Sequence, residues 1–253
     1  AAAGAAARAS SILAEATADA ADALRWEGEV LTGERLRREA NATLARAGVS
    51  DAGNTAVRVG GPRAEGGEFR AADAPIRPGE TVAVDLAPRG PKGYHAALSR
   101  TFVVDGDGGW ERRAHVACES ALRVGRSEIE PGASASRVRG EVAAEVAAYG
   151  FEMDRGNRSG GERREGGGEE DERGEVGRRG GGIADATVHG VGLSRCEPPS
   201  GRAGGTLREG AVVVMRASVS GPEGEIRLAD AVAVTAEGCE VLAEAPRRLT
   251  PEA

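Results

Sequence analysis

Two long strand-like stretches, each interrupted by a turn that contains glycine and proline, constrain the fold of this chain more than any other feature. The first occupies residues 79–104, where the alternation of residues 81–86 meets a turn rich in proline and glycine and a second strand-like run, residues 94–104, follows. The second stretch, residues 210–235, has the same arrangement. Alternation with period two, interrupted by Gly and Pro, is typical of a β-hairpin. We therefore expect two antiparallel hairpins at the centre of the fold.

The two hairpins carry side chains at matching positions. Asp85 and Arg216 each lie six residues after the glycine that opens their hairpin, and Ala97 and Ala229 lie eighteen and nineteen residues after it. This internal similarity predicts two related halves, each of which presents two of these positions toward a shared centre.

Helical spacing surrounds the hairpins. A helix is expected over residues 5–25, and a second over 34–47 with Thr32 as its N-cap. Two more are expected over 111–126 and from Ser134 to Tyr149, and residues 55–59 read as a short strand. Helices alternating with antiparallel hairpins predict an α+β fold.

Residues 154–182 differ from the rest of the chain. They combine many glycines with mixed charges, and Val176 is their one apolar residue. Such a segment buries too little apolar surface to offset the entropy of ordering. We expect a flexible insertion within a single domain that spans residues 1–253, either a solvated tether or a charged docking loop.

Several motifs carry a family resemblance. VDL followed by GYHAALSRTFVV, then VHGVGLSRCEPP, then LREGAVVV and IRLADAVAVTAEGCEVL, resemble the motifs of methionine aminopeptidases, Xaa-Pro aminopeptidases, prolidases and creatinases, peptidase family M24. The resemblance spans about residues 8–245. It implies the pita-bread fold, with two pseudo-symmetric halves, central antiparallel hairpins and helices outside. Two-domain members carry an additional N-terminal domain, and the sequence leaves open whether one precedes Ala1.

The resemblance implies five positions that hold two divalent metals in active relatives. Here these positions are Asp85, Ala97, His189, Arg216 and Ala229. Only Asp85 and His189 keep a donor side chain, and Arg216 brings a permanent positive charge. We therefore expect no metal cofactor.

Positions that handle substrate in the family also differ. Histidines expected there fall near Glu68 and on Asp185 and Cys196, whereas Glu197 is retained. Metal-free creatinases rely on the histidine that is missing near Glu68. The residues that the family uses in turns, packing and pairing are retained. They include Gly93, Arg100, Thr101, Gly190, Gly192, Arg227 and Asp230. A preserved scaffold with altered ligands is typical of a pseudoenzyme, and no residue is assigned a catalytic role, although His189 and Glu197 match the family motif.

Other chemistry has weaker support. Asp85, His189, Cys196 and Glu197 together have the donor types of a mixed zinc site, but the spacing is not one of the usual zinc motifs. A nucleophilic Cys196–His189 pair has the right residue types, yet a lone cysteine is more often inert. His95 and His115 are expected at the surface.

Net charge and cysteine content narrow the functional class. A net charge of −7 disfavours a nucleic-acid partner, and no apolar run reaches the ~18 residues that span a bilayer. Three widely spaced cysteines suit the reducing cytoplasm better than a disulfide framework.

Three functions follow from these observations. The first is a non-catalytic module that binds a peptide or protein in the cleft. The second is a residual Xaa-Pro aminopeptidase-like or prolidase-like hydrolase, or a metal-free creatinase-like one. The third is a purely structural subunit or one that forms a homodimer. In all three, Asp85 and Arg216 are expected to form an ion pair where the resemblance places metal.

Overall fold

The computed structural model describes residues 1–49, 55–60, 72–106, 108–154, 182–221 and 223–252. In these residues the helices are α1 (Ala2–Glu15), α2 (Gly33–Arg46), α3 (Gly109–Ser127) and α4 (Ala135–Ala148). The strands of the first half are β1 (Thr17–Ala18), β2 (Leu24–Trp26), β3 (Glu29–Val30), β4 (Thr55–Val59), β5 (Thr81–Leu86) and β6 (Leu98–Val103). Those of the second half are β7 (Glu152–Met153), β8 (Ile183–Gly190), β9 (Glu197–Ser200), β10 (Val212–Gly221), β11 (Gly224–Thr235) and β12 (Gly238–Val241).

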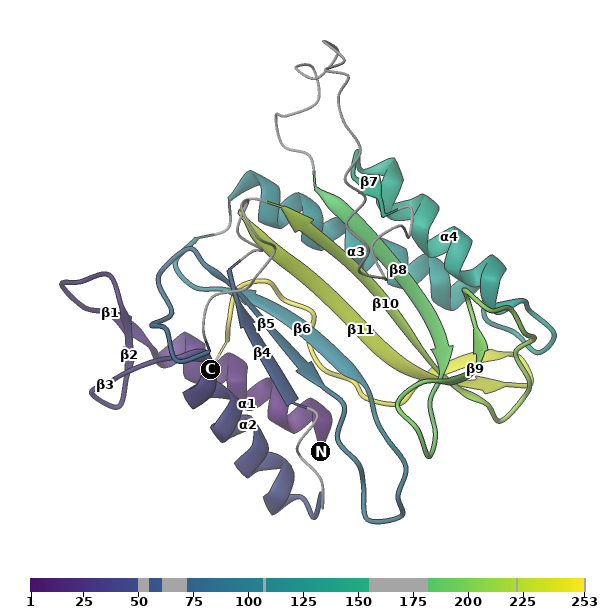
Figure 1. The fold of residues 1–253 in the computed structure, drawn as a ribbon, viewed down its shortest axis with the longest axis horizontal. Coiled ribbons are helices and arrows are strands. Elements are labelled where there is room, and N and C mark those ends of the chain that lie inside the picture. The colour runs from purple at the N-terminus through teal and green to yellow at the C-terminus, as the bar shows by residue number, and fades with distance from the viewer. Residues whose placement is uncertain (50–54, 61–71, 107, 155–181, 222, 253) are drawn as a thin grey trace, which may run out of the picture.

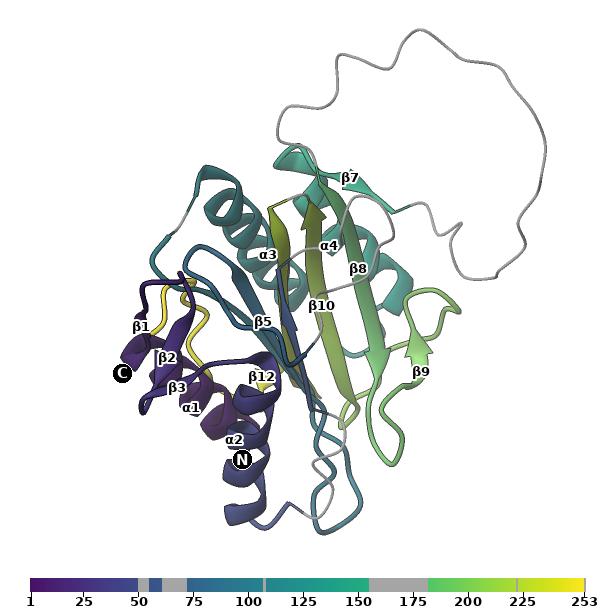
Figure 2. The same ribbon diagram turned by 60° about the vertical axis from the view of Figure 1, so that its left-hand side comes forward.

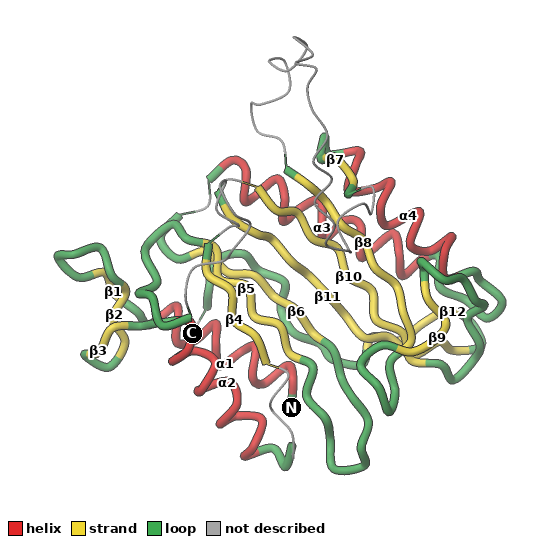
Figure 3. Tube along the Cα trace, viewed as in Figure 1, coloured by secondary structure: helices red, strands yellow, loops and turns green. Residues whose placement is uncertain are grey.

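A large sheet of nine strands forms the centre of the molecule (Figure 3). Its order is β4-β5-β6-β11-β10-β8-β7, with β12 beside β11 and β9 beside β8. Only the short β7–β8 pair is parallel among the pairings that the structure describes. The two expected hairpins are β5–β6 and β10–β11, and they join where β6 pairs with β11. The predicted α+β class, with antiparallel hairpins at the centre of two related halves, is confirmed.

Alternation along the strands separates a helix-covered face from an open face. Val84 of β5 and Leu98 of β6 pack in the core beneath α1 and α2, whereas Met215 of β10 and Leu228 of β11 pack beneath α3 and α4. Because Leu98 lies opposite Asp230 of β11, the even-numbered side chains of β6 and β11 share one face. All four helices therefore cover the same face, one pair for each half (Figures 1 and 2). None of the described helices combines the length and apolarity needed to cross a membrane.

The first predicted helix is shorter than expected. It ends at Glu15, and residues up to Val30 form the small sheet β1–β2–β3 instead of continuing to residue 25. The Asp19 carboxylate accepts hydrogen bonds from the backbone N–H groups of Ala21 and Ala23, which replaces helical pairing with a local turn. Leu24 is buried on β2 rather than on a helix.

The other predicted elements agree more closely with the structure. α2 begins after Thr32, whose Oγ1 accepts the Arg35 N–H at 3.1 Å, and α3, α4 and β4 lie at their expected positions. β6 begins at Leu98 rather than at residue 94, because the preceding residues form a loop. Of the expected insertion, residues 154–182, residues 155–181 lie outside the described residues.

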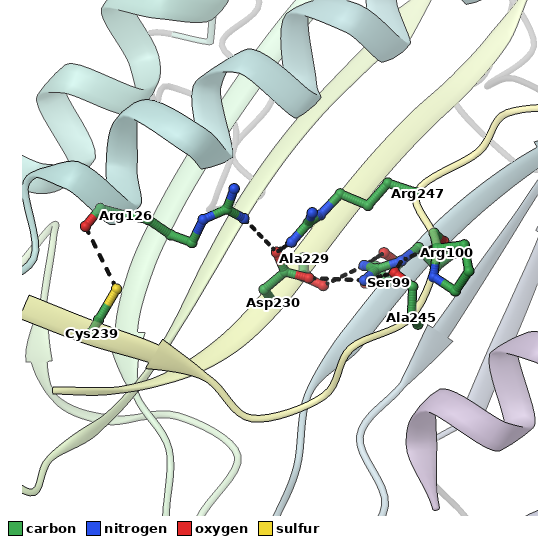
Figure 4. A network of polar contacts seen from close by, with 9 residues as sticks. Ser99, Arg100, Arg126, Ala229, Asp230, Cys239, Ala245 and Arg247 are labelled. Atoms are coloured by element: carbon green, nitrogen blue, oxygen red, sulfur yellow. Dashed lines mark hydrogen bonds and ion pairs between the residues drawn. The ribbon is translucent and has the colours of Figure 1, made fainter. Parts of the chain in front are cut away.

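A buried network of charges connects the two halves on the helix-covered face (Figure 4). The Asp230 carboxylate, 0% exposed, accepts bonds from Arg100 Nη2 at 3.0 Å, Arg126 Nη1 at 3.4 Å and Arg247 Nε at 3.2 Å. Arg100 also donates to the carbonyl oxygens of Ala229 and Ala245. The network therefore connects β6, β11, α3 and the C-terminal segment through the Asp230 carboxylate.

Candidate functional site

One continuous row of side chains crosses the open face of the sheet. From β4 through β5, β6, β11 and β10 to β8, the paired residues are Ala56, Asp85, Ser99, Ala229, Arg216 and Thr187. Strand pairing holds these residues at the same level, so their side chains leave the sheet on one side. The hairpins thus place Asp85 and Arg216 on a shared surface, as their matching positions predict.

This row forms the floor of a cleft of about 330 Å³. Its other polar or reactive lining residues are Arg58, His189, Arg195, Cys196 and Arg227. Ala97, at the end of the loop before β6, also lines it. The structure therefore brings together Asp85, Ala97, His189, Arg216 and Ala229, the five positions at which the resemblance implies metal. Glu68 lies outside the described residues.

Three side chains of the described residues contact the Asp85 carboxylate. Its carboxylate accepts hydrogen bonds from the Arg58 guanidinium and from the Ser99 hydroxyl. Arg227 Nη1 lies 3.8 Å from the same carboxylate, and Arg227 also binds Glu225. Burial opposes the charge of Arg227, but Asp85 and Glu225 raise its pKa. Asp85 is thus an ion-pair partner of two arginines.

Arg216 has a different partner from the one expected. Its Nη2 lies 3.5 Å from the Asp185 carboxylate, and Asp185 also accepts from Arg202 Nη2 at 3.3 Å. The predicted Asp85–Arg216 ion pair is wrong because β6 and β11 separate the two residues. Three strand spacings of about 4.7–4.9 Å put their backbones about 14 Å apart. Asp185 lies on the adjacent strand β8, two residues from Thr187, the pairing partner of Arg216.

Burial and the neighbouring Arg227 lower the pKa of Arg216, while Asp185 and Asp85 oppose this effect. The buried Nε of Arg216 has no hydrogen-bond acceptor among the described residues. The positive charge of Arg216 on the floor of the cleft is therefore only partly balanced by Asp185 and Asp85.

The histidine motif forms one wall of the cleft. His189 Nδ1 lies 2.9 Å from the carbonyl oxygen of Gly190, which can only accept, so Nδ1 is the donor of this hydrogen bond. Glu197 accepts the backbone N–H of Ser194 at 2.6 Å and thereby shapes the loop between β8 and β9. Cys196 on that loop is exposed, and the structure gives no hydrogen bond between it and His189, both of which lie in the described residues. This geometry does not form a nucleophile–base pair.

The donors that line the cleft do not fit a pair of divalent metal ions. Within the described ranges no group of three or more His, Cys, Asp or Glu side chains converges as metal ligands. Asp85 already binds Arg58 and Ser99, and the fixed charge of Arg216 lies on the floor of the same cleft. Two dications need several anionic oxygens to balance their charge, and a guanidinium adds repulsion instead.

Sequence reasoning did not identify all residues of the site. Arg58, Arg195 and Thr187 were not predicted to line the cleft, and Arg227 was expected only as a scaffold residue. Arg58 and Arg227 alternate with core residues in their strands, which places them on the open face. That alternation is the signal from which they could have been found.

Comparisons with known proteins agree with this architecture. The model of metallopeptidase family M24 matches residues 5–236. The X-Pro aminopeptidase of Thermotoga maritima superposes with a TM-score of 0.68 at 17% identity, over 87% of this chain and 55% of that protein. The prolidase of Pyrococcus horikoshii gives a TM-score of 0.67 at 21% identity, over 87% and 56%. The dipeptidase PepE of Mycobacterium ulcerans gives 0.67 at 20% identity, over 87% and 53%.

The chain thus spans about half the length of the solved structures it matches. A comparison with curated protein sequences gives no significant match. The structural matches confirm the expected pita-bread fold.

Proposed function

Because the chain belongs to metallopeptidase family M24, we propose that it is a non-catalytic member of the family that binds a peptide or protein segment in the open-face cleft. The observation that carries this proposal is the position of Arg216, whose guanidinium lies among the positions where the family resemblance implies metal. Ala97 and Ala229 supply no donor side chain at two further positions.

A peptide is the ligand class that the comparisons favour. The similar solved structures are an aminopeptidase, a prolidase and a dipeptidase by name, so each acts on a peptide. The cleft of this chain lies at the centre of the shared fold, where the two halves meet. We propose that peptide binding is kept while hydrolysis is lost. The three cysteines are free, which agrees with a reducing cytoplasmic location for this module.

A peptidase assay tests the proposal. The purified protein is incubated with Xaa-Pro and Met-Ala peptides in the presence of Mn²⁺ or Co²⁺, and the released amino acids are quantified. We expect no turnover above that of a His189→Ala variant. Metal-dependent turnover by the unaltered protein that disappears in His189→Ala would overturn the non-catalytic assignment.

A further inference from the structure

Positive charge dominates the lining of the cleft, although the whole chain has a net charge of −7. Among the described lining residues are four arginines, Arg58, Arg195, Arg216 and Arg227, and one carboxylate, Asp85. Arginine remains protonated under essentially all conditions. A concave surface lined by one sign of charge concentrates ligands of the opposite sign.

These arginines are not equally available to a ligand. Arg58 and Arg227 share Asp85, and Arg227 also binds Glu225. Arg216, in contrast, has one long contact to Asp185, at 3.5 Å, and its Nε lacks an acceptor in the described residues. Arg195 is exposed at the mouth and has no ion-pair partner in the part of the chain that the structure describes. Arg216 and Arg195 therefore retain donor capacity.

A neutral donor lies beside Arg216. Thr187 is its pairing partner on β8, and the buried Oγ1 of Thr187 also has no hydrogen-bond partner among the described residues. On the other side of Arg216, the small side chain of Ala229 leaves the floor of the cleft open. A guanidinium N–H and a hydroxyl on adjacent strands suit the two oxygens of a carboxylate or phosphate group.

Two exposed apolar side chains lie on the loops that lead to lining residues of the cleft. Tyr94 is 61% exposed and Leu193 is 62% exposed. They lie on the loops before β6 and after β8, which are joined by a hydrogen bond from the His95 N–H to the Gly192 carbonyl at 2.8 Å. Large exposed apolar side chains near a charged site suit a ligand that combines an anionic group with apolar neighbours.

We infer that the cleft binds a negatively charged oxyanion, a carboxylate or phosphate carried by a peptide, through Arg216 and Thr187 on the floor and Arg195 at the mouth. This inference rests on the proposed function as a peptide-binding module and specifies the charge of its ligand. A peptide that presented an ammonium group to the floor would meet Arg216 and be repelled. An acidic or phosphorylated segment would instead supply an acceptor for the Arg216 Nε, which has none among the described residues.

Calorimetric titration of the whole chain tests the inference. The probes are inorganic phosphate, citrate, a Glu-containing peptide, its phosphoserine counterpart and a matched peptide with Gln in place of Glu. We expect the acidic peptides to bind at least about tenfold more tightly than the Gln peptide, since a charge-assisted hydrogen bond contributes about that factor. Affinity should decrease as salt increases. The phosphoserine and Glu peptides distinguish the two sources of the oxyanion.

Variants locate the binding. Arg216→Gln should weaken binding of the acidic peptides at least about tenfold. Arg137→Gln is the control, because Arg137 is exposed on α4, on the helix-covered face. Arg195→Gln is a second test at an exposed position, so its effect on affinity does not depend on how well Arg216→Gln folds. Equal affinities of the wild-type protein for Glu and Gln peptides, or no loss in either cleft variant, would overturn the inference.

The outcomes separate this inference from the proposed function. Binding of both Glu and Gln peptides with equal affinity would leave the peptide-binding function intact and refute the anionic ligand. Binding of phosphate or citrate that depends on Arg216, without binding of any peptide, would support the anion site and contradict the peptide-binding function. Absence of binding by every probe would refute both.

Discussion

Removal of the Asp230 carboxylate should destabilise the protein strongly, because it connects both halves through buried charges. Asp230 is fully buried, and its partner Arg100 is 1% exposed. An Asp230→Ala variant leaves the Arg100 guanidinium buried without its carboxylate, and it also deprives Arg126 and Arg247 of a partner. Breaking a buried ion pair by removing one partner costs about 3–5 kcal/mol. In a chain of this size that corresponds to a decrease in melting temperature of about 6–20 °C.

Urea denaturation followed by circular dichroism measures this loss. Arg137→Ala is the matched control, because it removes an exposed ion pair with Glu128 from the surface of α4. Exposed pairs contribute about 0–1 kcal/mol, so the control should differ little from the unaltered protein. If the Asp230→Ala and Arg137→Ala variants were equally stable, Asp230 would not be the residue that stabilises the contact between the two halves. Retained hydrogen bonds from Arg100 to backbone carbonyls place the expected loss at the lower end of the range.

Three further predictions concern single features. Cys196 is exposed and Cys118 is fully buried with its thiol pKa raised by burial, so Ellman's reagent should label Cys196 in the native protein and reach Cys118 only on unfolding; rapid native labelling that persists in a Cys196→Ser, Cys239→Ser variant would contradict this. Burial lowers the pKa of His115, so the folded state binds fewer protons than the unfolded state below about pH 6.5. The free energy of unfolding should therefore decrease as the pH falls through this range, and His115→Gln should flatten the decrease; an unchanged slope would exclude His115 as its source. Replacing residues 154–182 with a short Gly/Ser linker should shift the melting temperature by only a few degrees, because the flanking residues Met153 and Ile183 lie on the paired strands β7 and β8 and loop closure entropy grows slowly with length; a large loss of stability would show that the segment packs on the domain.

The fold could be predicted from the sequence where local pattern and tertiary packing agree. The alternation of residues 81–86 and the matching stretch at residues 210–235 identified the hairpins, and Thr32 identified the start of α2. The pattern failed over residues 16–25, where Asp19 satisfies backbone N–H groups in a turn and ends the helical spacing. His115 was expected at the surface but is 7% exposed, because its helix packs against the sheet and the C-terminal segment.

The candidate site required information on strand order that the sequence does not contain. The pairing of Arg216 with Asp185 depends on β8 lying next to β10, and the distance between Asp85 and Arg216 depends on β6 and β11 lying between them. Matching positions in two hairpins predicted a shared surface but not the separation across it. The residues of the site were therefore largely predictable, whereas their ion-pair partners were not.

Metal content measured by plasma mass spectrometry tests the central claim most directly. The purified protein is incubated with excess Mn²⁺, desalted and analysed beside a variant that carries Ala97→Asp, Arg216→Glu and Ala229→Glu. The account predicts substoichiometric metal in the unaltered protein, because Arg216 is a fixed cation in the cleft and Asp85 is bound by Arg58 and Ser99. More metal is expected in the variant, which restores the carboxylates. One or more Mn²⁺ ions per unaltered chain, lost on substitution of Asp85 or His189, would contradict the account.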